Sequence, residues 1–271
     1  MKKLVVMLCV LVFSITQSAL AFDGEILFRD IPWGTDIVTF QELIHEDIAP
    51  LRDDLDDFSK QVILKFELVE KTNISYLDGS LVEKGEEQPY ETYFIKSSEN
   101  ENSGLTFYEC RVEAHDDVLI AGYPVSEVRG YAVNSVEDGV LFCEAERSKL
   151  VKCSYYFDGE SVPDTTQTFQ NLMEKLEKVY GEYNLSIIDS SYNVPWKWIW
   201  FGTNNTYVCL SSSSNVPSDE WYYGSILNIE YGVTNVGDMI EMCLHPEITA
   251  FEETEHTEEL IVINPNDTSG L

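Results

Sequence analysis

The sequence predicts an α+β fold in which one antiparallel sheet, or two related sheet-and-helix lobes, carries one or two amphipathic helices on a face. The clearest evidence lies between Gly139 and Gly181, where two alternating runs precede a capped helix pattern. Apolar side chains recur there at helical spacing, at Phe169, Leu172, Met173, Leu176, Val179 and Tyr180. Such a stripe needs an apolar partner surface, and the neighbouring strands supply one.

Residues 1–21 have the three regions of a secretory signal peptide. Lys2 and Lys3 precede an apolar run over 4–15, and small residues stand at Ala19 and Ala21. The apolar run is too short to span a bilayer. We therefore expect cleavage after Ala21 and an exported product, periplasmic or extracellular.

The first part of the remaining chain predicts a strand over 25–28 and a turn at IPWGT, with Thr35 as a helix cap. A helix should follow, with an apolar stripe of Ile37, Phe40, Ile44, Ile48 and Leu51, ended or kinked by Pro50. Leu55, Phe58 and Val62 extend the pattern into a second short helix. From Val62 the period changes to two, which predicts a strand through Leu64, Phe66 and Leu68.

A meander is expected next, with strands over 90–96, 105–113, 118–121 and 128–133 and two strands paired around Ser148. The amphipathic helix then begins near Asp164, Thr165 or Thr166 and ends at Gly181, a residue suited to the left-handed conformation. Three more strands, over 196–201, 206–211 and 221–231, predict a three-stranded sheet. A short helix over 236–243 and a strand over 260–263 complete the chain.

The order of elements suggests four segments. Residues 1–21 form the signal peptide, 22–134 a helix with a β-meander, 135–251 a hairpin, helix and three strands, and 252–271 an acidic C-terminal segment. Strand, helix and meander occur in both central segments, without enough residue identity for a sequence repeat.

The chain is strongly acidic, with a formal charge of −31. Without residues 1–21 it has 15 basic and 48 acidic residues, a charge of −33. Such a surface repels nucleic acid and anionic lipid, so we expect neither as a partner. Solubility is the simplest reason for the acidity. Calcium or a cationic partner is the alternative, at Asp53, Asp54, Asp56 and Asp57 or at the Glu252, Glu253, Glu255, Glu258 and Glu259 run.

Five cysteines follow the signal peptide, at Cys110, Cys143, Cys153, Cys209 and Cys243. Cys143 and Cys153 lie symmetrically about Ser148, so a tight hairpin there would allow a disulfide between them. The alternative is that the cysteines are small apolar residues on buried strand faces.

Several segments resemble a loosely defined group of exported bacterial proteins of unknown function. They are FRDIPWGT, SYYF followed by FQNLMEKLEKVYG, and the later W, TYVCL and LNIEY segments, covering 25–35 and 155–231. The helix-and-sheet lobes are also similar to β-lactamase-inhibitor and BamE-type envelope folds, which bind proteins. This resemblance implies a binding role and supplies no catalytic residues.

No motif indicates a metal, a cofactor or a catalytic nucleophile. Trp196, Trp198 and Trp200 share one face of a strand, with Tyr222 nearby. These rings are core if a helix covers them, and a platform for a protein, peptide or sugar if they are open. We therefore expect a non-catalytic binding module for an envelope or extracellular protein. The alternatives are a hydrolase of carbohydrate or cell-wall substrates and a cation-responsive envelope protein.

Overall fold

The computed structural model describes residues 22, 24–78, 94–99, 105–115, 118–157, 165–189, 194–212 and 227–246. Its helices are α2 (Ile37–Asp47), α3 (Asp57–Glu67), η1 (Ala145–Arg147), α4 (Thr165–Tyr180) and α5 (Val236–Leu244). The strands of the first half are β1 (Leu68–Lys71), β2 (Asn73–Asp78), β3 (Phe94–Glu99), β4 (Phe107–Glu113), β5 (Leu119–Ile120), β6 (Tyr123–Pro124) and β7 (Glu127–Val133). Those of the second half are β8 (Ser135–Glu137), β9 (Val140–Phe142), β10 (Lys149–Phe157), β11 (Leu185–Asp189), β12 (Val194–Phe201), β13 (Thr206–Ser212) and β14 (Leu227–Val233).

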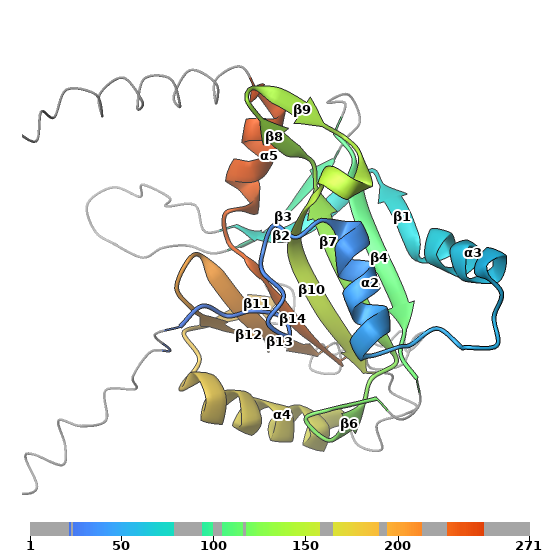
Figure 1. Ribbon diagram of the computed structural model, residues 1–271. Helices are drawn as coiled ribbons and strands as arrows, with labels where there is room; N and C mark the ends of the chain where they lie inside the picture. The colour runs from blue at the N-terminus through green and yellow to red at the C-terminus, as the bar shows by residue number, and fades with distance from the viewer. Residues whose placement is uncertain are drawn as a thin grey trace, which may run out of the picture. The chain divides into compact units, whose positions relative to one another are not determined.

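A large antiparallel sheet dominates the fold, with the strand order β1-β4-β7-β10-β14-β13-β12-β11 (Figure 1). Three two-stranded sheets, β2-β3, β5-β6 and β8-β9, accompany it. Helices pack on the large sheet, so the predicted α+β class is confirmed. Both edge strands are short, and β11 is irregular between Ile187 and Ile188. Short, irregular edges limit pairing with another chain.

The chain divides into two compact units. The unit that we call the α4 unit takes the described residues of Met1–Asp30, Glu113–Val128 and Cys153–Val233. The other, the α2–α3 unit, takes those of Ile31–Val112, Arg129–Lys152 and Thr234–Leu271. The sequence boundary expected between residues 134 and 135 stays a prediction.

In the α4 unit, the predicted amphipathic helix packs on the tryptophan strand. Leu172 is fully buried, and Phe169 contacts Trp198 of β12 with ring centroids 4.7 Å apart. Gly181 ends α4 with φ +81°, the left-handed conformation expected for that position. The Gly181 carbonyl accepts a hydrogen bond of 2.8 Å from the Trp200 indole, which joins the end of the helix to the sheet.

Strands β12, β13 and β14 pair in consecutive antiparallel register, which confirms the predicted three-stranded sheet. Asn204 and Asn205, both at positive φ, form the turn between β12 and β13. Two consecutive positive φ values match the right-handed twist of a tight hairpin, and asparagine tolerates them better than most residues. The predicted strand over 260–263 lies outside the described residues.

In the α2–α3 unit, α2 begins one residue later than the sequence predicted. Asp36 is the cap, because its carboxylate accepts the backbone N–H groups of Val38 and Thr39 at 3.1 and 2.9 Å. Thr35 instead donates its hydroxyl to the Pro32 carbonyl. Aspartate is a better cap than threonine in general, so this preference already favoured Asp36 over the predicted Thr35.

Packing of α2 on the sheet depends on a phenylalanine of the helix and a glycine of the strand beneath it. Phe40 of α2 is fully buried, and it lies directly over Gly130 of β7. A Cβ atom at position 130 would lie 2.7 Å from Cδ1 of Phe40, closer than real side-chain contacts allow. The glycine therefore lets helix and strand approach closely.

Two predictions in this unit are wrong, one of a strand and one of a strand pairing. The alternation from Val62 to Leu68 belongs to α3, which is helical through Glu67 and reaches β1 only at Leu68. Alternation over so few residues also fits a helix, and Asp56 starts that helix by accepting the Ser59 N–H at 2.7 Å. The hairpin expected around Ser148 is also wrong, since β9 pairs with β8 and β10 lies between β7 and β14.

We expect Gly130→Ala to lower the free energy of unfolding by about 1–3 kcal/mol, because the added methyl overpacks against Phe40. Chemical denaturation of the purified protein measures this change. Phe40→Leu in the same chain should recover part of the loss by removing the ring. Additive losses in the double variant would contradict the proposed contact.

Candidate functional site

The structure places two of the predicted binding tryptophans under α4. Trp200 is fully buried, and Trp198 is half-buried against Phe169. This packing supports the core alternative for these two rings. The side chain of Trp196, and Tyr222 as a whole, lie outside the described residues, so a binding surface formed by them stays a prediction.

Cys143 and Cys153 are both thiols in the structure. Cys143 is exposed after β9, and Cys153 is buried in β10. The expected disulfide depended on a hairpin around Ser148, and that hairpin is not formed. Burial raises the pKa of the Cys143 thiol, with Glu144 adding to the effect, and a raised pKa disfavours the reactive thiolate.

The acidic run over 53–57 lies at the start of helix α3. Asp56 caps it, and Asp54 forms a two-point ion pair with Arg52 at 2.9 and 2.5 Å. No group of three or more His, Cys, Asp or Glu side chains placed to hold a metal occurs within the described ranges. The acidic run that begins at Glu252 lies outside them. No helix of the described part of the chain is long and apolar enough to cross a membrane.

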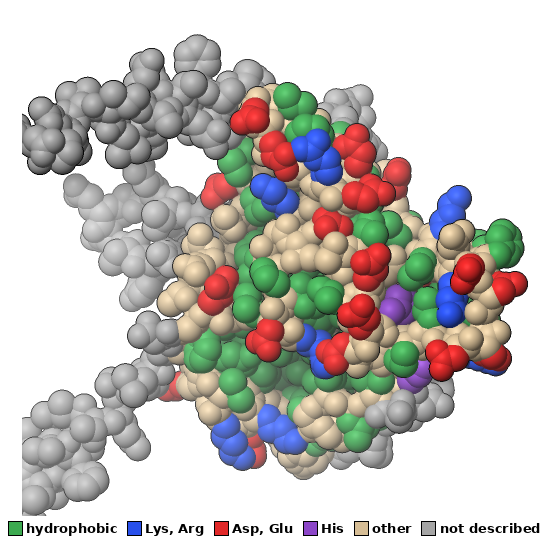
Figure 2. Space-filling view, in the orientation of Figure 1, with side chains coloured by type: hydrophobic (Ala, Val, Ile, Leu, Met, Phe, Trp, Pro, Cys, Tyr) green, Lys and Arg blue, Asp and Glu red, His purple; other side chains and the backbone are tan. Residues whose placement is uncertain are grey.

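Helix α3 has an unusual distribution of apolar side chains. It has no buried residue, and Phe58 and Phe66 are 74% and 79% exposed. Val62 lies midway between them and is half-buried. Residues four apart are offset by only about 40° on a helix, so the three side chains share one side, which we call the α3 aromatic face. Figure 2 shows hydrophobic side chains at the surface over α3, with charged side chains beside them.

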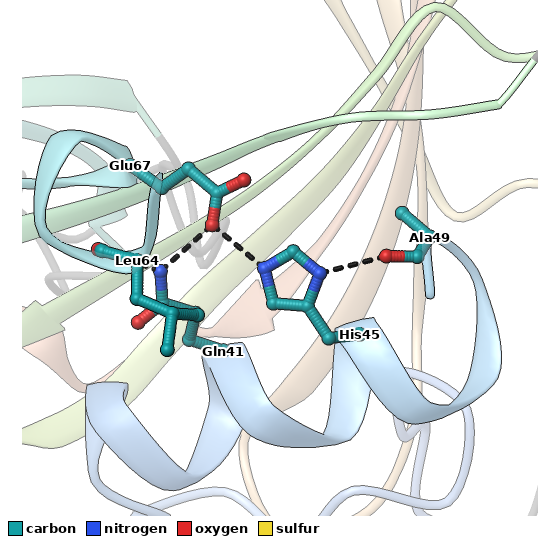
Figure 3. A network of polar contacts seen from close by, with 5 residues as sticks. All are labelled: Gln41, His45, Ala49, Leu64 and Glu67. Atoms are coloured by element: carbon teal, nitrogen blue, oxygen red, sulfur yellow. Dashed lines mark hydrogen bonds and ion pairs between the residues drawn. The ribbon is translucent and has the colours of Figure 1, made fainter. Parts of the chain in front are cut away.

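Polar contacts join α3 to α2 (Figure 3). Gln41 of α2 donates its amide N–H groups to the Leu64 carbonyl at 2.9 Å and to Glu67 Oε2 at 2.8 Å. The same carboxylate oxygen lies 2.7 Å from His45 Nε2. His45 Nδ1 lies 2.7 Å from the Ala49 carbonyl oxygen. We call this set of contacts the His45 network.

The geometry of the His45 network selects the protonated imidazole. A carbonyl and a carboxylate both accept hydrogen bonds, so both ring nitrogens of His45 must donate. A neutral ring would point one lone pair at an oxygen atom. Burial lowers the pKa of His45, but the hydrogen bond to Glu67, the hydrogen bond to Ala49 and the Glu67 charge outweigh it, and the pKa lies above its ordinary value.

The arrangement lets α3 present aromatic rings to solvent. Glu67 and Leu64 face α2, whereas Phe58 and Phe66 do not contribute to the core. Exposed phenylalanine side chains favour burial by a few kcal/mol each when a partner surface covers them. The α3 aromatic face therefore leaves two phenylalanine side chains largely uncovered among the described residues.

Two carboxylates, Glu109 and Glu230, are buried, one in each unit, and both have polar partners within their own unit. Glu109 lies 2.6 Å from the Lys71 ammonium, and Arg111 and Arg129 lie 3.7 Å away. Burial raises the pKa of Glu109, but the hydrogen bond and charge of Lys71, with smaller contributions from Tyr131 and Arg111, outweigh it and hold the pKa below its ordinary value. This carboxylate is a structural ion-pair centre.

In the α4 unit, Glu230 accepts the Tyr207 hydroxyl at 2.8 Å and lies 4.0 Å from Lys197. Burial lowers the pKa of Lys197, but the charge of Glu230 outweighs it, and the pKa lies above its ordinary value. The lysine therefore stays charged and is not poised as a base at neutral pH.

The sequence patterns did not predict the exposed aromatic side chains of α3 or the contact between His45 and Glu67. An apolar residue at helical spacing predicts burial, so Phe58 and Phe66 were assigned to a stripe and to a strand. The one sequence feature that indicated a helix starting near Phe58 was the run of aspartates before it, since one of them supplies the helix cap.

Comparisons of the chain with protein-family models, with curated proteins and with solved structures found no match. The resemblance to exported bacterial proteins therefore stays an expectation.

We expect protein stability to fall as pH rises above the ordinary histidine pKa of about 6.5. Because the pKa of folded His45 is raised, its contribution is complete below that value and is lost as pH passes the folded pKa. His45→Gln should cost about 1–3 kcal/mol at pH 6, and less at pH 9. Denaturant unfolding from pH 6 to pH 9 measures how the free energy of unfolding changes with pH in the unchanged protein and in the His45→Gln variant.

The matched control for this experiment is His245→Gln. His245 is half exposed, directly follows α5 and lies 3.5 Å from Glu241, four residues earlier. This variant should keep the slope of the unchanged protein. Equal slopes for the His45 variant and the unchanged protein would refute the assignment.

Proposed function

We propose that the protein is a non-catalytic binding module that recognises a protein partner through the α3 aromatic face. The observation that carries the proposal is the exposure of Phe58 and Phe66 on a helix with no buried residue. Aromatic side chains that leave solvent on binding are frequent anchors of protein interfaces. The proposal moves the binding surface from the tryptophan strand to α3, because Trp200 is core.

The chemistry of the partner follows from charge. A chain of net charge −31 repels nucleic acid and anionic lipid, which leaves a protein with its own apolar helix face or groove. If the signal peptide expected over 1–21 directs export, that partner lies in the cell envelope or outside the cell. The hydrolase and cation-responsive alternatives have no observation in their favour among the described residues.

Site-specific photo-cross-linking tests the proposal. Phe66 of the full chain is replaced by a photoreactive phenylalanine analogue, and the protein is irradiated among the exported proteins of its own cells. We expect a discrete adduct with a protein, and Phe58→Ala in the same chain should reduce its yield. Mass spectrometry gives the mass and composition of the adduct.

The control carries the same analogue at Val179 of α4, an apolar helix residue that is 61% exposed. It should give no such adduct. Identical adducts at both positions, or none at position 66, would count against the α3 aromatic face as a binding surface.

A further inference from the structure

On the exposed side of α3, the apolar residues read the same in both chain directions, and the flanking charges reverse their sign. Phe58, Val62 and Phe66 form its centre, with an aromatic ring four residues on either side of the valine. Asp57, Gln61 and Lys65 form the flank, and all three are exposed. The flank therefore has an acid and a base four residues on either side of a neutral amide.

A helix with this pattern is complementary to an antiparallel copy of itself. Rotation about a two-fold axis near Val62 places Phe58 opposite Phe66 of the second copy, and does so twice. The same rotation places Asp57 opposite Lys65 of the second copy, also twice. Antiparallel alignment further brings each positive helix N-terminus near a negative C-terminus.

Local charge permits this contact although the chain as a whole is acidic. Asp57 and Glu67 balance Lys60 and Lys65, so α3 is formally neutral in a chain of net charge −31. Charges farther away than about 8 Å are largely screened at physiological ionic strength. Helix α3 thus has an apolar face and no net formal charge of its own, although the exposed Asp53, Asp54 and Asp56 directly precede it.

We propose that the partner recognised by the α3 aromatic face is a second copy of this chain, joined through an antiparallel, two-fold α3–α3 contact. This inference rests on the proposed function and names its partner. Phe58, Val62 and Phe66 make the apolar centre of the contact, and Asp57 and Lys65 set its direction.

The contact area sets the strength of the dimer. Two phenylalanines that are each about three-quarters exposed bury on the order of 300 Å² per copy, well below the roughly 800 Å² per partner of a stable interface. The dimer is therefore weak and reversible. We expect a dissociation constant on the order of 0.1 mM, as for weak and transient contacts of this size.

Sedimentation equilibrium of the full chain tests the proposal over a range from about 5 µM to 1 mM, which spans the expected dissociation constant. We expect a concentration-dependent rise from the monomer mass to the dimer mass. Phe58→Ala with Phe66→Ala should weaken the dimer by at least about tenfold. Val179→Ala, at an exposed apolar position of α4, should leave the dissociation constant unchanged.

A charge-exchange experiment tests the antiparallel direction. Asp57→Lys alone and Lys65→Asp alone should each weaken the dimer by about tenfold, since each variant sets two like charges opposite one another. An equimolar mixture of the two variants should recover most of the association, because each lysine then again faces an aspartate. A variant that merely unfolds α3 would show no such recovery, and far-ultraviolet circular dichroism follows the helix content of both.

Three results would overturn the proposal: a monomer at every concentration, a dimer insensitive to the two alanine substitutions, or no recovery in the mixture. The cross-linked adduct at position 66 separates this failure from failure of the proposed function. An adduct of twice the chain mass supports self-association. An adduct with a different protein contradicts self-association but supports the binding function. The absence of any adduct contradicts both proposals.

Discussion

The Glu67 carboxylate is the constraint on which the α2–α3 region depends. One of its oxygens accepts from the Gln41 amide and from the His45 ring at the same time. Hydrogen bonds to a charged, largely buried acceptor are among the stronger polar contacts in proteins. They replace the apolar packing that normally fixes a helix of this length, and α3 has no buried side chain of its own.

This division of tasks leaves the aromatic rings of α3 exposed to solvent while polar contacts still position the helix. In α4, apolar side chains do the packing, and Phe169 and Leu172 are buried. In α3 the corresponding apolar residues are available for another surface, since positioning is done by polar atoms at one end. The imidazolium of His45 adds a dependence on proton concentration, because its charge supports the contact.

Sequence patterns predicted those elements whose local and tertiary preferences agree. Helix α4, its terminal Gly181 and the three consecutive strands β12 to β14 were predicted, since amphipathic period and turn residues indicated the same structure. Within the predicted stripe of α4, Phe169, Leu172 and Leu176 are buried, whereas Val179 is 61% exposed. The prediction failed over 62–67, where a five-residue alternation fits a strand and a helix equally. It failed again at Ser148, whose hydroxyl accepts the Ile37 N–H at the start of α2 instead of lying in a hairpin turn.

The candidate site was harder to foresee than the fold. His45 and Glu67 are 22 residues apart and belong to different helices, so no local sequence spacing predicts their contact. Periodicity shows which side chains share a helix side, but it does not show whether that side is covered. Trp200 and Phe66 both belong to apolar patterns, yet one is fully buried and the other is 79% exposed.

The strand order has a consequence for the way the chain acquires its structure. Almost every side chain of β10 is buried, and one of its two neighbours in the sheet is β14, some seventy residues later. Contacts between such distant segments slow folding, because a long loop must close before they form. During synthesis, one edge of β10 therefore stays unpaired until Leu227–Val233 has left the ribosome. Until that time, its free backbone groups can bind chaperones or lead to aggregation.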